Sequence, residues 1–161
     1  MVDEPLASTP SGVDEAAWDA ACATVRAYCG WHVAPSVTQP MTVDGPGGSM
    51  LLLPTLHLTN VTSVTNDGTA VTDPEWSEAG MVRGAWSTKF RGVTLSMTHG
   101  YELCPDDVAL VAQALALRVQ ANPESAVRVQ RGPFSDQYEA GNGLTAFEKA
   151  TLDRYRLPPR P

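Results

Sequence analysis

Two long segments of the chain repeat apolar residues at the spacing of an α-helix. In residues 14–29 the apolar face consists of Trp18, Ala21, Cys22, Val25, Tyr28 and Cys29. In residues 105–121 it consists of Val108, Val111, Ala112, Leu115 and Val119. Asp14 suits the N-cap of the first helix and Gly30 its end, while Pro105 suits the first position of the second helix. The pattern therefore predicts two amphipathic helices.

Between these helices the period changes to two, which is the spacing of a half-buried strand. Residues 50–101 contain short runs rich in threonine and apolar side chains, and the alternation is clearest in residues 92–99. Residues 66–68 (Asn-Asp-Gly) are typical of a tight hairpin turn, with the returning strand near residues 69–72. A second pair of strands is expected to involve Trp76, residues 81–83 and Trp86. We interpret this region as a small antiparallel sheet or meander.

The C-terminal part of the chain, residues 123–161, is interpreted as an extended arm. Residues 124–143 show no sustained period and are interrupted by glycine and proline, so we expect little regular structure in them. Such a long irregular stretch is unusual inside a compact domain, and an arm that becomes ordered on a neighbour would explain it. A final helix is predicted over residues 145–156, because Thr145 and Glu148 have the spacing of a capping box.

The predicted fold class is α+β: a small bundle of two main helices and a C-terminal helix, with an antiparallel β insertion and an extended C-terminal arm. A length of 161 residues suits one domain with arms better than two independent cores. Residues 1–12, rich in proline, serine, threonine and acids, are expected to form a mobile leader. The α+β body is then expected to cover residues 13–122 and the arm residues 123–161.

The net charge of −7 and the pI of about 4.8 argue against nucleic-acid binding through neutralised phosphates. The charge is uneven, since residues 1–20 carry five acids and no base, while residues 149–161 carry four bases and one acid. Two chain ends of opposite charge suit head-to-tail assembly, but the charge alone favours the simpler interpretation that both ends are solvated tails. The sequence contains no apolar run of the roughly 18 residues that a membrane span needs, so we expect a soluble protein made in a cytoplasm. Three cysteines without a pairing pattern indicate reduced thiols.

The candidates for chemistry in the sequence are weak. Cys29 and His32 form one close pair, with Cys22, His99 and Cys104 elsewhere, whereas a zinc site needs four ligands, usually as two close pairs. The glycine-rich segment 45–48 lacks the lysine and hydroxyl of a phosphate-binding loop. Asp106 and Asp107 are explained by the helix dipole. Trp31, Trp76 and Trp86 are more typical of a core or an interface than of base stacking. We therefore expect no enzyme activity, no cofactor and no metal.

Several short segments, in order along residues 15–160, resemble one protein family. They are residues 25–35 (VRAYCGWHVAP), 45–48 (GPGG), 51–56 (LLLPTL), 98–101 (THGY), 105–108 (PDDV), 132–135 (GPFS), 144–148 (LTAFE) and 152–158 (LDRYRLP). The ordered set resembles the head-to-tail connector proteins of tailed phages of actinobacteria, also called head-completion or adaptor proteins. The resemblance implies a small helical bundle with a β insertion and a structural role in the virion.

The resemblance also implies partners and a location. Such proteins are expected to bind as a twelve-membered ring beneath the portal protein, and to offer a surface to the next neck or tail component. DNA would pass through the channel without specific binding, no membrane would be involved, and assembly would occur in the host cytoplasm. Two other function classes stay open: another neck or tail role, such as a stopper or tail terminator, and a small binding module or enzyme of bacterial metabolism.

The arm carries the side chains that we expect at an interface. Apolar, aromatic and basic residues are combined there: Phe134, Tyr138, Leu144, Phe147, Lys149, Leu152, Arg154, Tyr155 and Arg156. One interpretation is that they bind the portal or a neighbouring copy, because residues 141–143 (Gly-Asn-Gly) would loosen the tether. The alternative is that they fold back on the core of their own subunit.

Overall fold

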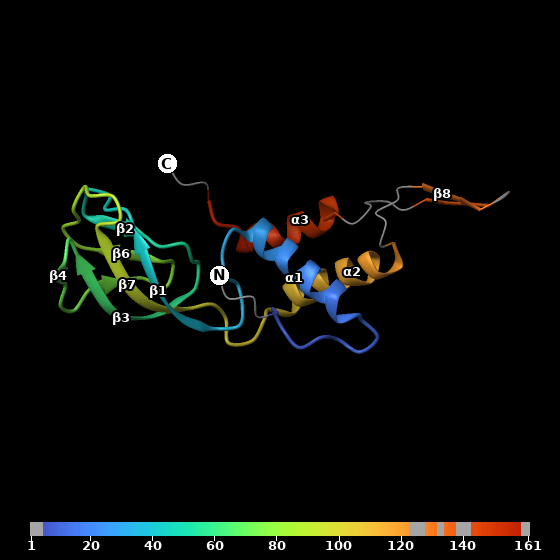
Figure 1. The fold of residues 1–161 in the computed structure, drawn as a ribbon, viewed down its shortest axis with the longest axis horizontal. Coiled ribbons are helices and arrows are strands. Elements are labelled where there is room, and N and C mark those ends of the chain that lie inside the picture. Colours follow the sequence, from blue (N-terminus) through green and yellow to red (C-terminus); the bar gives the residue numbers. More distant parts are fainter. Residues whose placement is uncertain (1–4, 123–127, 132–133, 138–142, 159–161) are drawn as a thin grey trace. The chain divides into compact units, whose positions relative to one another are not determined.

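The fold is described from a computed structural model of the chain (Figure 1). It describes residues 5–122 and 143–158 in full, and residues 128–131 and 134–137 by their backbone. The chain forms two compact units. A helical unit consists of Met1–Cys29 with Cys104–Arg156, and a β unit consists of Gly30–Leu103 with Leu157–Pro161. This confirms the α+β class predicted from the sequence.

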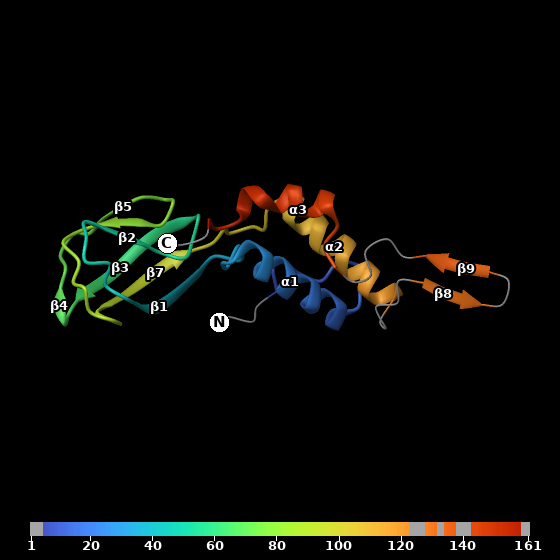
Figure 2. The ribbon, with the colours of Figure 1, turned by 90° about the horizontal axis from the view of Figure 1, so that it is seen from above.

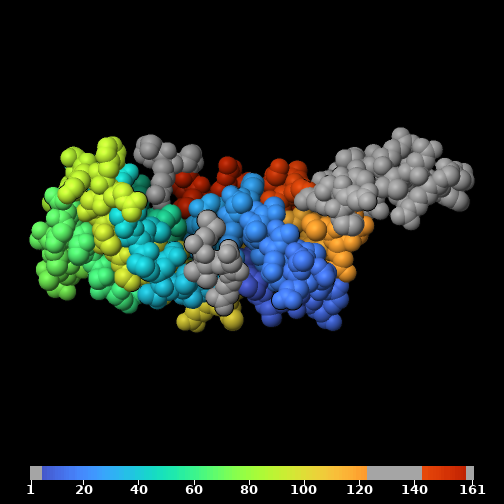
Figure 3. Space-filling model, viewed as in Figure 1, coloured from blue at the N-terminus to red at the C-terminus, as the bar shows by residue number. Residues whose placement is uncertain are grey.

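The helical unit is built on α1 (Glu15–Cys29) and α2 (Asp106–Ala121), which pack against each other. Most residues of the two predicted apolar faces are buried, among them Trp18, Val108 and Leu115, each no more than 1% exposed. Tyr28 and Val119 of these faces are only half-buried. The short helix α3 (Ala146–Leu152) continues into a 3₁₀ turn, η1 (Asp153–Tyr155), and contacts both longer helices. The space-filling view shows α3 lying directly against α1 (Figure 3).

The start of the described chain belongs to the helical unit. Leu6 is 1% exposed, and the indole N–H of Trp18 donates a hydrogen bond to the carbonyl of Ala7 at 3.0 Å. The sequence predicted a mobile leader over residues 1–12, whereas residues 5–7 are packed on the helices. The physical reason is that a buried tryptophan requires an acceptor for its N–H, and the leader provides it.

Two short strands lie between α2 and α3, where the sequence predicted little regular structure over residues 124–143. These strands, β8 (Arg128–Arg131) and β9 (Phe134–Gln137), pair in antiparallel register from Arg128 opposite Gln137 to Arg131 opposite Phe134. Figure 2 shows them side by side as a hairpin. Four residues per strand are too few for an alternating pattern to stand out in the sequence, which is why the prediction missed them.

The β unit contains two antiparallel sheets. The larger has the order β1-β7-β3-β4 and consists of β1 (Val37–Val43), β7 (Val93–His99), β3 (Leu58–Asn66) and β4 (Thr69–Ala70). The smaller has the order β2-β6-β5 and consists of β2 (Met50–Leu52), β6 (Met81–Arg83) and β5 (Glu75–Trp76). Both sheets contribute to one apolar core, which is formed by Leu51, Leu53, Leu58, Val64, Val82, Trp86, Val93, Leu95 and Met97.

The sequence located most of these strands but not β1. The predicted hairpin at residues 66–68 joins β3 to β4, and β7 has the predicted alternation, with Val93, Leu95 and Met97 buried. Strand β1 was missed because it is a half-buried edge strand with Pro40 in its middle, a residue that a central strand would not tolerate. Trp86 was expected in a strand but lies in a loop, where its N–H donates to the carbonyl of Val82.

None of the helices in the described residues is both long and apolar enough to cross a lipid bilayer.

Candidate interaction surfaces

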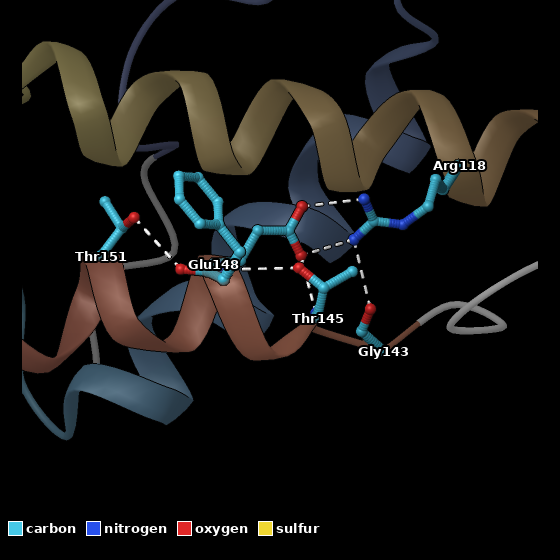
Figure 4. Close-up of polar contacts among 6 residues, drawn as sticks. Arg118, Gly143, Thr145, Glu148 and Thr151 are labelled. Atoms are coloured by element: carbon cyan, nitrogen blue, oxygen red, sulfur yellow. Dashed lines mark hydrogen bonds and ion pairs between the residues drawn. The ribbon is translucent and has the colours of Figure 1, made fainter.

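Helix α3 is tied to α2 by a buried ion pair (Figure 4). The guanidinium of Arg118 on α2 donates from its two terminal nitrogens to the two carboxylate oxygens of Glu148 on α3, both at 2.8 Å. The same guanidinium donates to the carbonyl of Gly143 at 3.2 Å. The side chain of Glu148 is only 8% exposed. The two helices are therefore joined where solvent screening is weak.

The capping box predicted at the start of this helix is present. The hydroxyl of Thr145 accepts a hydrogen bond from the backbone N–H of Glu148, and the Glu148 carboxylate accepts one from the backbone N–H of Thr145 at 2.8 Å. Burial raises the pKa of Glu148, but the hydrogen bonds from Arg118 and Thr145 lower it by more, so the net shift is downward. The carboxylate is thus held in its charged form.

A second set of contacts ties the end of α3 to the longer helices. The hydroxyl of Tyr28 donates to the carboxylate of Asp153 at 2.6 Å, and that of Tyr155 donates to Asp107 at 2.9 Å. Arg154 is ion-paired with Asp107 at 3.4 Å, and the guanidinium of Arg156 lies over the ring of Tyr28 at 5.2 Å. The final helix therefore belongs to its own subunit, which was the alternative left open by the sequence.

These contacts sort the predicted interface residues. Leu152 is fully buried, and Leu144 and Tyr155 are half-buried. Phe147 is 80% exposed, and Lys149, Arg154 and Arg156 are exposed as well. The side chains of Phe134 and Tyr138 lie outside the described residues. The exposed surface of α3 and of the segment directly after it thus combines one large aromatic side chain with basic side chains.

Several large apolar side chains that the sequence did not single out are exposed as well. Met50, Leu52 and Met81 occupy the outer face of the smaller sheet, where Leu52 lies opposite Met81. The remaining ones are Trp76, Phe90, Leu103, Leu110 and Leu117. For Leu110 and Leu117 a signal was available, since both lie off the apolar face predicted for α2. Leu52 and Met81 are neighbours across two strands, whereas exposed apolar side chains that stand singly are normal on a protein surface.

The cysteine and histidine candidates do not assemble into a reactive site. Cys29 lies in the core of the helical unit, where burial, together with the charge of Cys104, raises the pKa of its thiol to about 12. His32 lies in the β unit, where a ring nitrogen contacts the carbonyl of Pro35. Among the described residues, no three His, Cys, Asp or Glu side chains are grouped so that they could hold a metal ion.

A groove of about 230 Å³ runs beside α1 and is lined by Pro5, Asp19, Cys22, Ala23 and Arg26. Its thiol, Cys22, is buried, and burial raises the pKa of that thiol. A cysteine in this condition is a poor nucleophile at neutral pH. The groove therefore contains a thiol, but not one that is activated as a nucleophile.

The fold is similar to that of one chain in each of two solved particle necks. One is described as the neck of a native GTA (gene transfer agent) particle computed with C12 symmetry, with a TM-score of 0.63, 17% sequence identity, and coverage of 92% of this chain and 85% of that chain. The other is the neck of an empty GTA particle computed with C6 symmetry, with a TM-score of 0.57, 17% identity, and coverage of 97% and 85%. The sequence matches no protein-family model and no curated protein.

Proposed function

We propose that this chain is a structural, non-enzymatic component of the neck of a phage-like particle and works there as one copy in a ring. The observation that carries the proposal is the fold match to a particle neck over 92% of the chain and 85% of the matched chain. The match includes both units rather than one common motif. The sequence resemblance to head-to-tail connectors, which rests on separate evidence, supports the same function.

Within the neck, we assign the chain to the head-to-tail connector position, as an adaptor between the portal protein and the next neck or tail component. The ring would be twelve-membered, in line with the C12 symmetry used for one of the similar necks. The net charge of −7 suits a channel through which DNA slides without being held. A stopper or tail terminator would have the same chemistry and a different partner.

The solvent face of the C-terminal helix is the surface that we assign to the portal or the next neck component. Phe147, 80% exposed, is the apolar anchor, and the exposed Lys149, Arg154 and Arg156 of the same C-terminal segment add positive charge, although Arg154 is also paired with Asp107. Large aromatic side chains and arginines are common among the residues that contribute most to binding at interfaces. The basic groups would steer the approach to an acidic partner and make the encounter rate sensitive to salt.

The experiment is deletion of the gene in a strain that produces the particles, with the chain supplied in trans. We expect the deletion to give DNA-filled heads and separate tails in electron micrographs, and the wild-type chain to restore joined particles. Phe147→Ser should restore joining poorly, whereas Trp76→Ser, a change at a large exposed side chain of the β unit, should restore it well. Joined, infectious particles in the deletion strain would exclude the proposed function.

The same strain distinguishes the neck positions. Crosslinking of the chain in wild-type particles, followed by mass spectrometry, identifies its neighbours. An adaptor crosslinks to the portal protein, whereas a tail terminator crosslinks to tail components and remains with tails that have detached from heads.

A further inference from the structure

Phe90 stands at the tip of a tight turn in the β unit and is 84% exposed. The turn spans residues 89–92 and is closed by a hydrogen bond from the N–H of Gly92 to the carbonyl of Lys89 at 3.1 Å. Arg91 has φ of 54°, a left-handed conformation that costs energy for a residue with a side chain. The turn thus contains a strained backbone conformation and holds a large apolar side chain in solvent.

Neighbouring loops fix this turn from two sides. The N–H of Arg91 donates to the carboxylate of Asp44 at 2.7 Å, and the N–H of Gly45 donates to the carbonyl of Lys89 at 2.9 Å. On the other side, the ammonium of Lys89 pairs with the carboxylate of Asp67 at 2.6 Å. A side chain at Gly45 would clash with the backbone carbonyl of Ser87, so a glycine is needed there for the two segments to approach. The turn is therefore ordered before any partner arrives, which lowers the entropy cost of binding.

A suitable receiving surface lies on α2 in the helical unit. Leu110 is 65% exposed and Leu117 is 45% exposed, and the half-buried Gln113 and Ala114 lie between them. Residues at positions i, i+3, i+4 and i+7 of a helix enclose a hole of the kind that accepts an apolar knob. Here two of the four corners are leucines, one is the small Ala114 and one is Gln113. Among the described residues, nothing covers the two leucines, which are open to solvent.

The charges next to the two features are complementary. Arg91 follows Phe90 directly, and Asp106 lies one turn before Leu110 on the same face of α2. Neither the guanidinium of Arg91 nor the carboxylate of Asp106 forms an ion pair within the described part of the chain. A phenylalanine seated in the hole would leave its neighbouring arginine within reach of this carboxylate.

We propose that the turn 89–92 of one copy docks on α2 of the next copy, with Phe90 between Leu110 and Leu117 and Arg91 paired with Asp106. This inference rests on the proposed function, because a ring brings copies side by side. The contact joins two different surfaces, so it is heterologous and repeats from copy to copy around a ring. It also covers three of the exposed large apolar side chains at once.

Thiol trapping between full-length variants tests the contact. Arg91→Cys is mixed with Gln113→Cys, and a short thiol-specific crosslinker is added. The control mixture replaces Arg91→Cys with Thr59→Cys, an exposed position near the opposite end of β3 from the turn. We expect the test mixture to form covalent dimers about tenfold faster or more, because docking raises the effective concentration of the two thiols. Equal rates in the two mixtures would overturn the proposal, as would rapid dimerisation of Gln113→Cys with itself, which would mean that α2 faces α2.

Matched variants then test each side chain in the same trapping assay. Phe90→Ser should slow trapping about tenfold, as expected for an interface anchor, whereas Leu103→Ser, at an equally exposed leucine of the β unit, should not. For the charge test the thiol is placed at the exposed Thr88 (Thr88→Cys), so that Phe90 is kept. Arg91→Glu in this copy, or Asp106→Arg in its Gln113→Cys partner, should each slow trapping, and the two together should restore it. Failure of the reversed pair to restore the rate would remove the ion pair from the contact.

The two proposals fail separately. If the deletion strain needs the chain for joined particles but trapping fails, the neck function stands and this contact does not. If the strain makes joined particles without the chain, the neck function fails whatever the trapping shows.

Discussion

The guanidinium of Arg118 and the carboxylate of Glu148 form a two-pronged ion pair across 30 positions of sequence, with both nitrogen–oxygen distances 2.8 Å. The pair joins the long helix α2 to the short helix α3 (Figure 4). A helix of seven residues is not stable in water by itself, so it depends on this kind of contact. The pair therefore fixes the position of α3 on α2.

Removing one partner of this pair should destabilise the helical unit. Arg118→Ala leaves the 8% exposed carboxylate of Glu148 without its counter-ion, and we expect a loss of about 2–4 kcal/mol in the free energy of unfolding. Arg83→Ala, at the pair with Glu75 whose side chains are 64% and 69% exposed, should cost less than about 1 kcal/mol. Urea denaturation followed by circular dichroism measures both. Equal losses would show that the buried pair is no stronger than the surface pair.

The buried and the exposed large side chains of α3 should differ in their effect on stability. Leu152→Ala removes a fully buried side chain and should cost about 2–5 kcal/mol. Phe147→Ala, at an 80% exposed position, should change stability by about 0.5 kcal/mol or less. Thermal melting of the purified variants measures this difference. A large loss of stability from Phe147→Ala would place that ring against its own subunit.

Trp18 should be the most sensitive aromatic position of the helical unit. It is 1% exposed and its N–H has an acceptor in the leader, so Trp18→Ala should cost about 3–5 kcal/mol. Trp76→Ala, at a 37% exposed tryptophan on a sheet edge, provides the matched control and should cost much less. Chemical denaturation distinguishes the two. A loss below about 1 kcal/mol for Trp18→Ala would contradict the packing described here.

Acidification should weaken the β unit through His99. This side chain is buried, its Nδ1 has no hydrogen-bond partner within the described residues, and its Nε2 lies 2.9 Å from the Gln39 amide nitrogen. Burial, and to a smaller degree the charge of His32, lowers its pKa from 6.5 to about 4. As the pH falls, His99 is therefore protonated in the unfolded chain before it is protonated in the folded protein. Its contribution to the free energy of unfolding is complete above pH 6.5 and is lost as the pH drops toward 4.

The measurement is urea denaturation of wild type and His99→Gln at several values between these limits. We expect wild type to lose about 1–3 kcal/mol over the interval, and the variant to lose clearly less. Both contain Glu148, whose lowered pKa also removes stability under more acidic conditions, so the difference between the two proteins isolates the histidine. Identical pH profiles would mean that His99 titrates normally in the folded protein.

Local patterns in the sequence determined much of the fold. The apolar faces of α1 and α2, the capping box at Thr145, the hairpin at residues 66–68 and the alternation in β7 all depend on residues within a few positions of one another. Periodicity reports such short-range order directly, because side-chain direction repeats with the backbone. The pattern failed where the period was short or broken, in β8, β9 and the proline-containing β1.

The tertiary structure alone decided which surfaces are used within the subunit. No local pattern shows that Asp107 contacts Tyr155 and Arg154, or that Arg118 pairs with Glu148. These hydrogen bonds and ion pairs join residues that are 30–48 positions apart. Nor does the sequence show that Phe90 is held out in solvent while Leu152 is buried, since both are large apolar residues beside charged ones. Exposure depends on what the rest of the chain places around a side chain, and that is a property of packing.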